Sequence, residues 1–229
     1  MSDPNPSTRH QSSDDAARTE PSAATLDELL TWWFGTPGPA PDTALRGAWF
    51  ARDDAFDAEL RELFGPLAAR AASEPGAFTA WRRDARGALG LMLLLDQCPR
   101  NLHRGTAAAF GSDALAREVA AGVVDAGLDQ HVPFICRTFL YLPFEHSEHL
   151  EDQRRSVALF ERLLADGKEA AASGHLTTKH LEGLHMIADY ARKHLDVIER
   201  FGRFPHRNAA LGRETTPDER VYLDGGGGF

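Results

Sequence analysis

Residues 96–101, with the sequence DQCPRN, form the stretch whose residue types are best suited to chemistry. They follow the apolar run 88–95, which is typical of a buried helix. Polar groups at the end of a buried helix need polar partners elsewhere in the fold, because an unpaired buried polar group is costly. Two further segments offer such partners, residues 146–148 and 200–208. We predict that the three segments meet in one site.

The charges in and near these segments favour mutual neutralisation. Asp96 is expected at the C-terminal end of its helix, where the helix dipole disfavours a negative charge. It therefore needs a cationic partner, and the candidates are Arg100, Arg104 and Arg203. Residues 145–152 contain four acids, whereas residues 192–213 contain six bases against two acids. The acidic and basic patches are complementary.

Two interpretations of these charges remain open. In the first, arginines and carboxylates form a structural network that locks helix ends together, a role that suits the planar, bidentate guanidinium. In the second, a pocket binds the carboxylate or phosphate of a small anionic or polar molecule. The residues predicted to bind such a ligand are Asp96, Arg100, Asn101, Arg203 and Arg207.

Histidines flank the same segments and would add acid–base chemistry, because imidazole titrates near neutral pH. The candidates for proton transfer are His146, Glu148 and His206; His185 and His194 lie nearby in the sequence. An ordinary side-chain hydrogen bond is the alternative role of each histidine. The spacing of His185 and Asp189 suits two metal ligands on one helix face, but it is too common by chance to predict a metal site. The sequence predicts no particular cofactor and leaves open whether the protein is an enzyme.

Other reactive or aromatic residues are assigned to packing. Cys98 lies where a nucleophile could act, but no motif places a base beside it. The chain contains no G-x-S-x-G elbow, P-loop or dinucleotide fingerprint. The aromatic residues predicted to lie in the core, instead of in a cofactor box, are Trp32, Trp33, Phe34, Trp49, Phe50 and Trp81.

Helices must position these residues, because apolar side chains recur at helical spacing and no stretch reads as a confident strand. We expect an all-α array of about eight helices in a single domain. The predicted helices occupy about residues 26–34, 53–72, 78–97, 113–127, 134–143, 148–164 and 178–201, with a last one from 217 onward. Small residues over 167–174 are expected to form a connection, for which a partly helical conformation is the alternative.

Several residues mark the expected helix ends. Residues 25–28 and 216–219 match the capping-box pattern, in which a hydroxyl and a carboxylate satisfy free backbone N–H groups. Ser147 is a suitable N-cap residue. Pro66 is expected to kink or end its helix, and Pro99 to prevent the continuation of another, because proline lacks the N–H that an interior position needs.

The length of 229 residues suits one sizeable core. Residues 1–24 are polar and are expected to form a disordered tail before a domain over 25–229. The net charge of -9 argues against nucleic acid as a partner. No signal peptide is visible, and no apolar run approaches the ~20 residues of a membrane-spanning helix. With two cysteines that form no disulfide pattern, we expect a soluble, cytoplasmic protein.

Three stretches resemble, in order, the signature motifs of one family. They are residues 94–101 (LLDQCPRN) with 104–106, residues 140–148 (LYLPFEHSE) with 152–153, and residues 201–208 (FGRFPHRN) with 211–213. They are similar to those of the bacterial DUF924 proteins, and the resemblance covers about residues 26–229. It implies an all-α, TPR-like fold and no established activity. The family usually has phenylalanine where this chain has Cys98, which favours an apolar packing role there.

Two classes of function follow. The first is the pocket for a small anionic or polar molecule, with acid–base chemistry by histidine and glutamate. The second is a TPR-like module whose groove binds a protein or peptide, with the arginine–carboxylate contacts purely structural. The pocket is slightly favoured, because a pure scaffold needs fewer charged groups at helix ends. The oligomeric state is not predicted.

Overall fold

The computed structural model describes residues 20–35 and 45–228 of the chain. Within these ranges the chain forms helices and turns and no β-strand, which confirms the predicted all-α class. The helices are α1 (Ala23–Phe34), α2 (Asp54–Ser73), α3 (Ala85–Met92), α4 (Cys98–Leu102), α5 (Asp113–Asp125), α6 (Phe134–Glu145), α7 (Leu150–Ala172), α8 (Thr178–Phe201) and α9 (Pro217–Asp224). Residues 1–19 of the predicted tail lie outside the described residues, whereas Ala23 and Ala24 form the first turn of α1.

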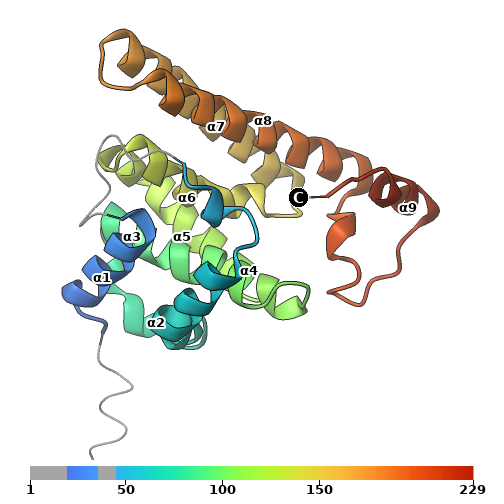
Figure 1. Ribbon diagram of the computed structural model, residues 1–229, viewed down its shortest axis with the longest axis horizontal. Coiled ribbons are helices and arrows are strands. Elements are labelled where there is room, and N and C mark those ends of the chain that lie inside the picture. Colours follow the sequence, from blue (N-terminus) through green and yellow to red (C-terminus); the bar gives the residue numbers. More distant parts are fainter. Residues whose placement is uncertain (1–19, 36–44, 229) are drawn as a thin grey trace, which may run out of the picture.

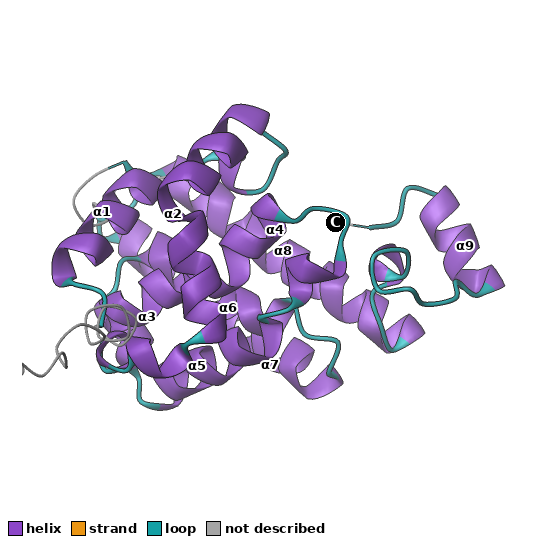
Figure 2. Cartoon of the chain, turned by 90° about the horizontal axis from the view of Figure 1, so that it is seen from below, coloured by secondary structure: helices purple, strands orange, loops and turns teal. Residues whose placement is uncertain are grey.

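The helices are arranged as a body, a hairpin and a hook. Figure 1 shows α1 to α6 gathered in one body, with α7 and α8 lying side by side across it as a long hairpin. Residues 202–228, here called the C-terminal hook, follow α8 and contain α9. Figure 2 shows that the hook projects beyond the body and that the chain after α9 turns back toward it.

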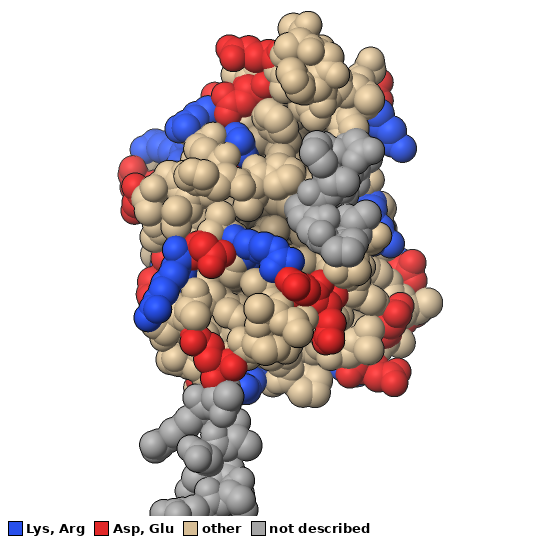
Figure 3. All heavy atoms as spheres, turned by 90° about the vertical axis from the view of Figure 1, so that its left-hand side faces the viewer, with Lys and Arg blue, Asp and Glu red and all other residues tan. Residues whose placement is uncertain are grey.

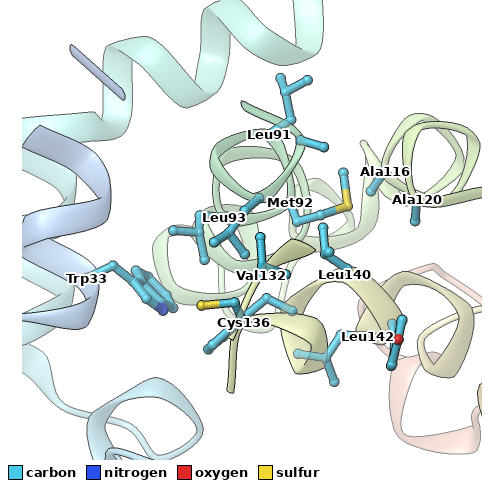
Figure 4. Close-up of a cluster of buried hydrophobic side chains, with 14 of the residues drawn as sticks. Trp33, Leu91, Met92, Leu93, Ala116, Ala120, Val132, Cys136, Leu140 and Leu142 are labelled. Carbon is cyan, nitrogen blue, oxygen red and sulfur yellow. The ribbon is translucent and has the colours of Figure 1, made fainter. Parts of the chain in front are cut away.

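The core lies between α1, α3, α5 and α6 (Figure 4). Trp33, Met92, Cys136 and Leu140 are all fully buried there. Burial of a leucine or methionine side chain contributes about 1.5–3 kcal/mol relative to exposure. The predicted aromatic core is largely confirmed, with the exception of Phe50, which is 48% exposed.

The predicted start of the first helix is wrong, whereas the second helix has its predicted range. Helix α1 begins at Ala23, and its N-cap is Ser22, whose hydroxyl accepts from the N–H of Thr25 at 3.1 Å. Residues 25–28 therefore form no capping box. Helix α2 runs to Ser73, in agreement with the predicted range 53–72. Of the two effects expected of Pro66, it does not end the helix, because Phe64 and Ala68 on either side of the proline are buried in the same core.

The predicted helix over 78–97 is divided. Two 3-10 turns precede α3, and a π-helical turn (Leu93–Gln97) joins α3 to α4. The helical path continues past Pro99, contrary to prediction. In an α-helix, residue 99 would donate its N–H to the carbonyl of Leu95, and proline cannot do so. The hydroxyl of Ser112 donates to Leu95 O instead, at 2.6 Å, which satisfies the carbonyl that proline leaves open.

Helix α7 also differs from prediction at both ends. Ser147 lies before the helix, whose N-cap position is His149, and the Ser147 hydroxyl accepts from the His149 N–H at 3.1 Å. The helix continues through the expected connection to Ala172. Gly167 permits this packing, because a Cβ there would lie 2.3 Å from the Cδ1 of Leu184 on α8.

The last two helices begin as predicted. Thr177 precedes α8, and Thr216 with Glu219 forms the predicted capping box of α9. Acidic and basic side chains are interspersed on the face shown in Figure 3. Among the described residues, no helix combines the length and the apolar character needed to cross a membrane.

Candidate functional site

The three segments predicted to converge do meet, and the first contact is between Asp96 and His146. Asp96 lies in the π-helical turn and is fully buried. Its Oδ1 is 2.8 Å from Nδ1 of His146 and 3.0 Å from Nη1 of Arg100, and its Oδ2 accepts from Gln97 at 2.6 Å. Of the three arginines considered as partners for Asp96, only Arg100 takes that role.

The surroundings of Asp96 fix the protonation of His146. Although burial raises the pKa of Asp96, Arg100 and His146 together lower it well below its usual value, so the group is a carboxylate. A carboxylate can only accept, so Nδ1 of His146 must carry the proton. Burial and Arg100 lower the pKa of His146, which makes the neutral form dominant near pH 7. Its Nε2 therefore offers a lone pair, and 14% of the side chain is exposed.

Two arginines share one carboxylate beside this pair. Arg100 donates two hydrogen bonds to Asp113 at the start of α5, at 2.9 and 3.0 Å. Arg207 from the hook reaches the same carboxylate only at 3.5 Å. Its guanidinium lies 4.6 Å from the ring of Phe110 and 4.4 Å from the ring of Phe204.

Arg207 is the least satisfied charge of this cluster. Its side chain is 7% exposed, and its Nε is buried with no hydrogen-bond partner in the described part of the chain. Burial and the nearby charge of Arg100 lower the pKa of Arg207 to about 10. A guanidinium remains charged at neutral pH even so. The hook thus holds a buried cation that, within the described residues, has one long contact with a carboxylate and a buried Nε without a partner.

Arg203 has a different environment. It donates to both carboxylate oxygens of Glu219, at 2.6 and 2.9 Å, and to Glu214 O at 2.8 Å. Glu219 also accepts from Asn208 and from the N–H of Thr216. These contacts close the hook on itself, as the structural-network interpretation predicts.

Glu148 joins the hook to the start of α7. It accepts from Arg213 at 2.7 and 3.0 Å and from the N–H of Phe204 at 2.8 Å. Partial burial raises the pKa of Glu148, but the hydrogen bonds from Arg213 and Phe204 outweigh it and lower the pKa. The structure places this residue in the arginine network that holds the hook.

The remaining predicted residues are Asn101 and His206. Asn101 is buried on α4, and its Nδ2 has no hydrogen-bond partner among the described residues. The ring of His206 is 5.5 Å from that of Phe204, and burial together with Arg207 lowers the pKa of His206 to about 4. The end of the hook passes close by, since a Cβ at Gly228 would lie 3.3 Å from the Cβ of His206.

Three members of the cluster are not predicted from the sequence. The sequence pattern assigns no role in the site to Asp113 or Phe110. Glu145 was counted among the acids without a position. The side chain of Glu145 is buried and its Oε1 lies 3.2 Å from Nδ1 of His194, whose ring is 6.3 Å from that of His146. The apolar stripe of α8 offered one signal, because His194 falls on it at helical spacing.

Metal ligation finds no support in the described ranges, where no group of three or more histidine, cysteine, aspartate or glutamate residues could hold an ion. His185 and Asp189 are exposed on α8. Cys98 and Cys136 are fully buried free thiols, and burial raises the pKa of each far above its usual value. Such thiols are poor nucleophiles, which agrees with the packing role predicted for Cys98.

Comparisons with known proteins agree with the fold. A family model described as a bacterial protein of unknown function (DUF924) matches residues 29–227. A solved structure, that of the protein of unknown function ATU0120 from Agrobacterium tumefaciens, is 36% identical with a TM-score of 0.72. The match covers 90% of this chain and 99% of that one. A search of curated proteins found no match.

Proposed function

This chain belongs to the bacterial DUF924 family, whose function is unknown, and we propose that it binds a small molecule carrying a carboxylate or phosphate. The proposed site is the cluster where the C-terminal hook meets the body. Arg207 holds the anionic group, and His146 exchanges a proton with the bound molecule. Asp96 orients His146, while Arg100 and Asp113 position Arg207.

The incomplete pairing of Arg207 is the observation that carries the proposal. A guanidinium has five N–H donors, and a buried charge is normally paired and hydrogen-bonded. Among the described residues, Arg207 instead has one hydrogen-bond contact, of 3.5 Å, to a carboxylate that Arg100 already engages through both oxygens. An oxyanion would complete its pairing, because carboxylates and phosphates match the guanidinium fork.

The same cluster supports proton transfer. With Nδ1 bonded to Asp96, the imidazole of His146 is held in one tautomer, so that Nε2 accepts a proton from a bound hydroxyl or carbon acid. His206 adjoins Arg207 and is the second candidate for this role. Glu148 and Arg203 serve to hold the hook in place, because both are bidentately paired within the protein.

Calorimetric titration with inorganic phosphate and, separately, with malonate tests the proposal. The wild type is expected to bind at least one of the two. Arg207→Met should keep the fold, judged by circular dichroism, and weaken binding at least tenfold. Arg154→Met on the exposed face of α7 is the matched control and should bind like the wild type. Equal binding by the wild type and Arg207→Met, or binding of neither anion, would refute the proposal.

A second candidate is the TPR-like module that binds a protein or peptide. Its support is a pair of exposed apolar side chains one turn apart on α8, Met186 and Tyr190, which are 45% and 43% exposed. A partner docked there would lose affinity with Tyr190→Lys and not with Arg207→Met. The opposite pattern would favour the anion site.

A further inference from the structure

Residues 225–228, here called the glycine strap, run back from the end of α9 toward the body, as Figure 1 and Figure 2 both show. The strap reaches His206, since a Cβ at Gly228 would lie 3.3 Å from the Cβ of His206. We propose that the glycine strap is a lid over His206, which opens to expose this imidazole to the molecule bound at Arg207. The proposal rests on the proposed function, in which His206 is the second candidate for proton transfer, and adds control of access to it.

Tyr222 on α9 holds the strap in its closed position. The N–H of Gly227 donates to the backbone carbonyl of Tyr222 at 2.9 Å. The backbone of Gly227 also lies against the aromatic ring, because a Cβ there would be only 2.5 Å from Cε1, Cε2 and Cζ of Tyr222. The ring in turn packs on Phe201 at the end of α8, with 5.2 Å between the two ring centroids. A residue without a side chain is therefore needed at position 227 for the strap to close.

The strap is held weakly compared with the turn that it covers. Its four glycines bury no side chain, and three of them are exposed. Segments with few buried apolar contacts open locally at a small fraction of the free energy of global unfolding. The turn that contains His206 follows Phe204, which is fully buried and packs on the end of α8. The strap can therefore move while the imidazole keeps its place.

Access to the proposed anion site requires such a movement. His206 and Arg207 lie in one 3-10 turn, and the Arg207 side chain is only 7% exposed. An oxyanion can reach the guanidinium only if part of its surroundings moves. The glycine strap adjoins this turn and has no side chain to withdraw from the core. Lids that close after binding shield proton transfer from water, and the strap would do so at His206.

Reaction of the ligand-free protein with diethyl pyrocarbonate near pH 7 measures how far the strap shields His206. The reagent modifies accessible neutral imidazoles, and mass spectrometry assigns the rate to each histidine. His185, exposed on α8, is the internal reference. In the wild type, His206 should react more slowly than His185.

Gly227→Ala places a methyl group against the Tyr222 ring and should hold the strap open. The minor state of a two-state element is typically populated to about 10% or less, so a permanently open strap should speed the modification of His206 about tenfold or more. Gly228→Ala is a second opening variant, because the backbone there has a φ of +133° that alanine adopts only with strain. The rate at His185 should not change in either variant.

Two matched controls should react like the wild type. Tyr222→Phe keeps both the ring face and the backbone carbonyl that hold the strap. Gly76→Ala adds a methyl group in open space outside the hook. Circular dichroism checks that each variant retains the fold.

Two results would overturn the proposal. Equal rates at His206 in the wild type and both opening variants would show that the strap shields nothing. A wild-type His206 that reacts as fast as His185 would show that no closed state exists. Neither result depends on anion binding, so failure here is distinguishable from failure of the phosphate and malonate titrations.

Discussion

Replacing Asp96 with asparagine removes the charge that holds the candidate site together, and it should destabilise the protein without unfolding it. The amide keeps the size of the carboxylate but presents one acceptor in place of two. Arg100 and His146 would compete for that acceptor, and Gln97 would face an amide N–H. The buried guanidinium of Arg100 would keep its hydrogen bonds to Asp113 and to the backbone carbonyl of residue 96, but it would lose the charge of Asp96.

The magnitude follows from these contacts. Removal of one partner from a buried ion pair typically costs 3–5 kcal/mol, because the other charge stays buried and uncompensated. Arg100 retains two hydrogen bonds to Asp113, so we expect the low end of this range, about 3 kcal/mol. For a chain of this size, each kcal/mol lowers the melting temperature by about 2–4 °C, which gives a decrease of roughly 6–12 °C. Total stabilities of about 5–15 kcal/mol leave the variant folded.

The pH dependence has a defined sign. Because the pKa of Asp96 is lowered in the folded protein, its contribution is fully present above its unfolded value of about 3.9 and is lost as the pH falls toward the folded value. The difference between wild type and Asp96→Asn should be constant from about pH 7 to 5 and should shrink below about pH 4.

Urea unfolding followed by circular dichroism at several pH values is the assay. Asp189→Asn on the exposed face of α8 is the control and should change stability little, as surface substitutions usually do. The reasoning is refuted if Asp96→Asn unfolds within about 1 kcal/mol of the wild type near pH 7, or if the difference between them is unchanged at pH 3.

Three further predictions concern the hook, the thiols and a close helix contact. Arg213→Met should leave the carboxylate of Glu148 without its guanidinium, lower the free energy of unfolding by about 2 kcal/mol, and expose the hook to limited proteolysis. Both buried cysteine thiols should resist a thiol reagent at pH 8 in the native protein and react once urea unfolds it. Gly87→Ala should destabilise the protein by about 1–3 kcal/mol, because its Cβ would lie 2.4 Å from the backbone oxygen of Trp81. Gly122→Ala, whose Cβ would meet no neighbouring atom, should stabilise the protein by up to about 1 kcal/mol. Thermal denaturation of the two variants and the wild type measures both effects.

The sequence predicts a helix well where local chemistry decides its ends. The starts of α8 and α9 are read correctly because Thr177 and Thr216 cap their own helices. The path through Pro99 cannot be read in this way. The carbonyl of Leu95, which receives no N–H from the proline, accepts a hydrogen bond from Ser112 instead. Ser112 lies 17 residues further along the chain, so local helix propensity cannot predict this partner.

The candidate site shows the same division. That Asp96 needs a partner follows from its charge and position, and the meeting of residues 96–101 with 146–148 is predicted on that basis. Which hook arginine lies in the cluster depends on the path of the hook. This path places Arg203 beside Glu219 and Arg207 beside Asp113 of the cluster. Glu145 cannot be predicted for a different reason, because its pKa is raised by burial and by Asp96, a residue 49 positions away in the sequence.

The most direct test of the account is a crystal structure of the wild type soaked in selenate, with anomalous data collected at the selenium edge. Selenate is a tetrahedral oxyanion like phosphate, and the anomalous signal of selenium locates it directly. The account predicts an anomalous peak within hydrogen-bonding distance of the Arg207 guanidinium and close to Nε2 of His146, absent from Arg207→Met crystals. A peak elsewhere on the surface with none at Arg207 would contradict it.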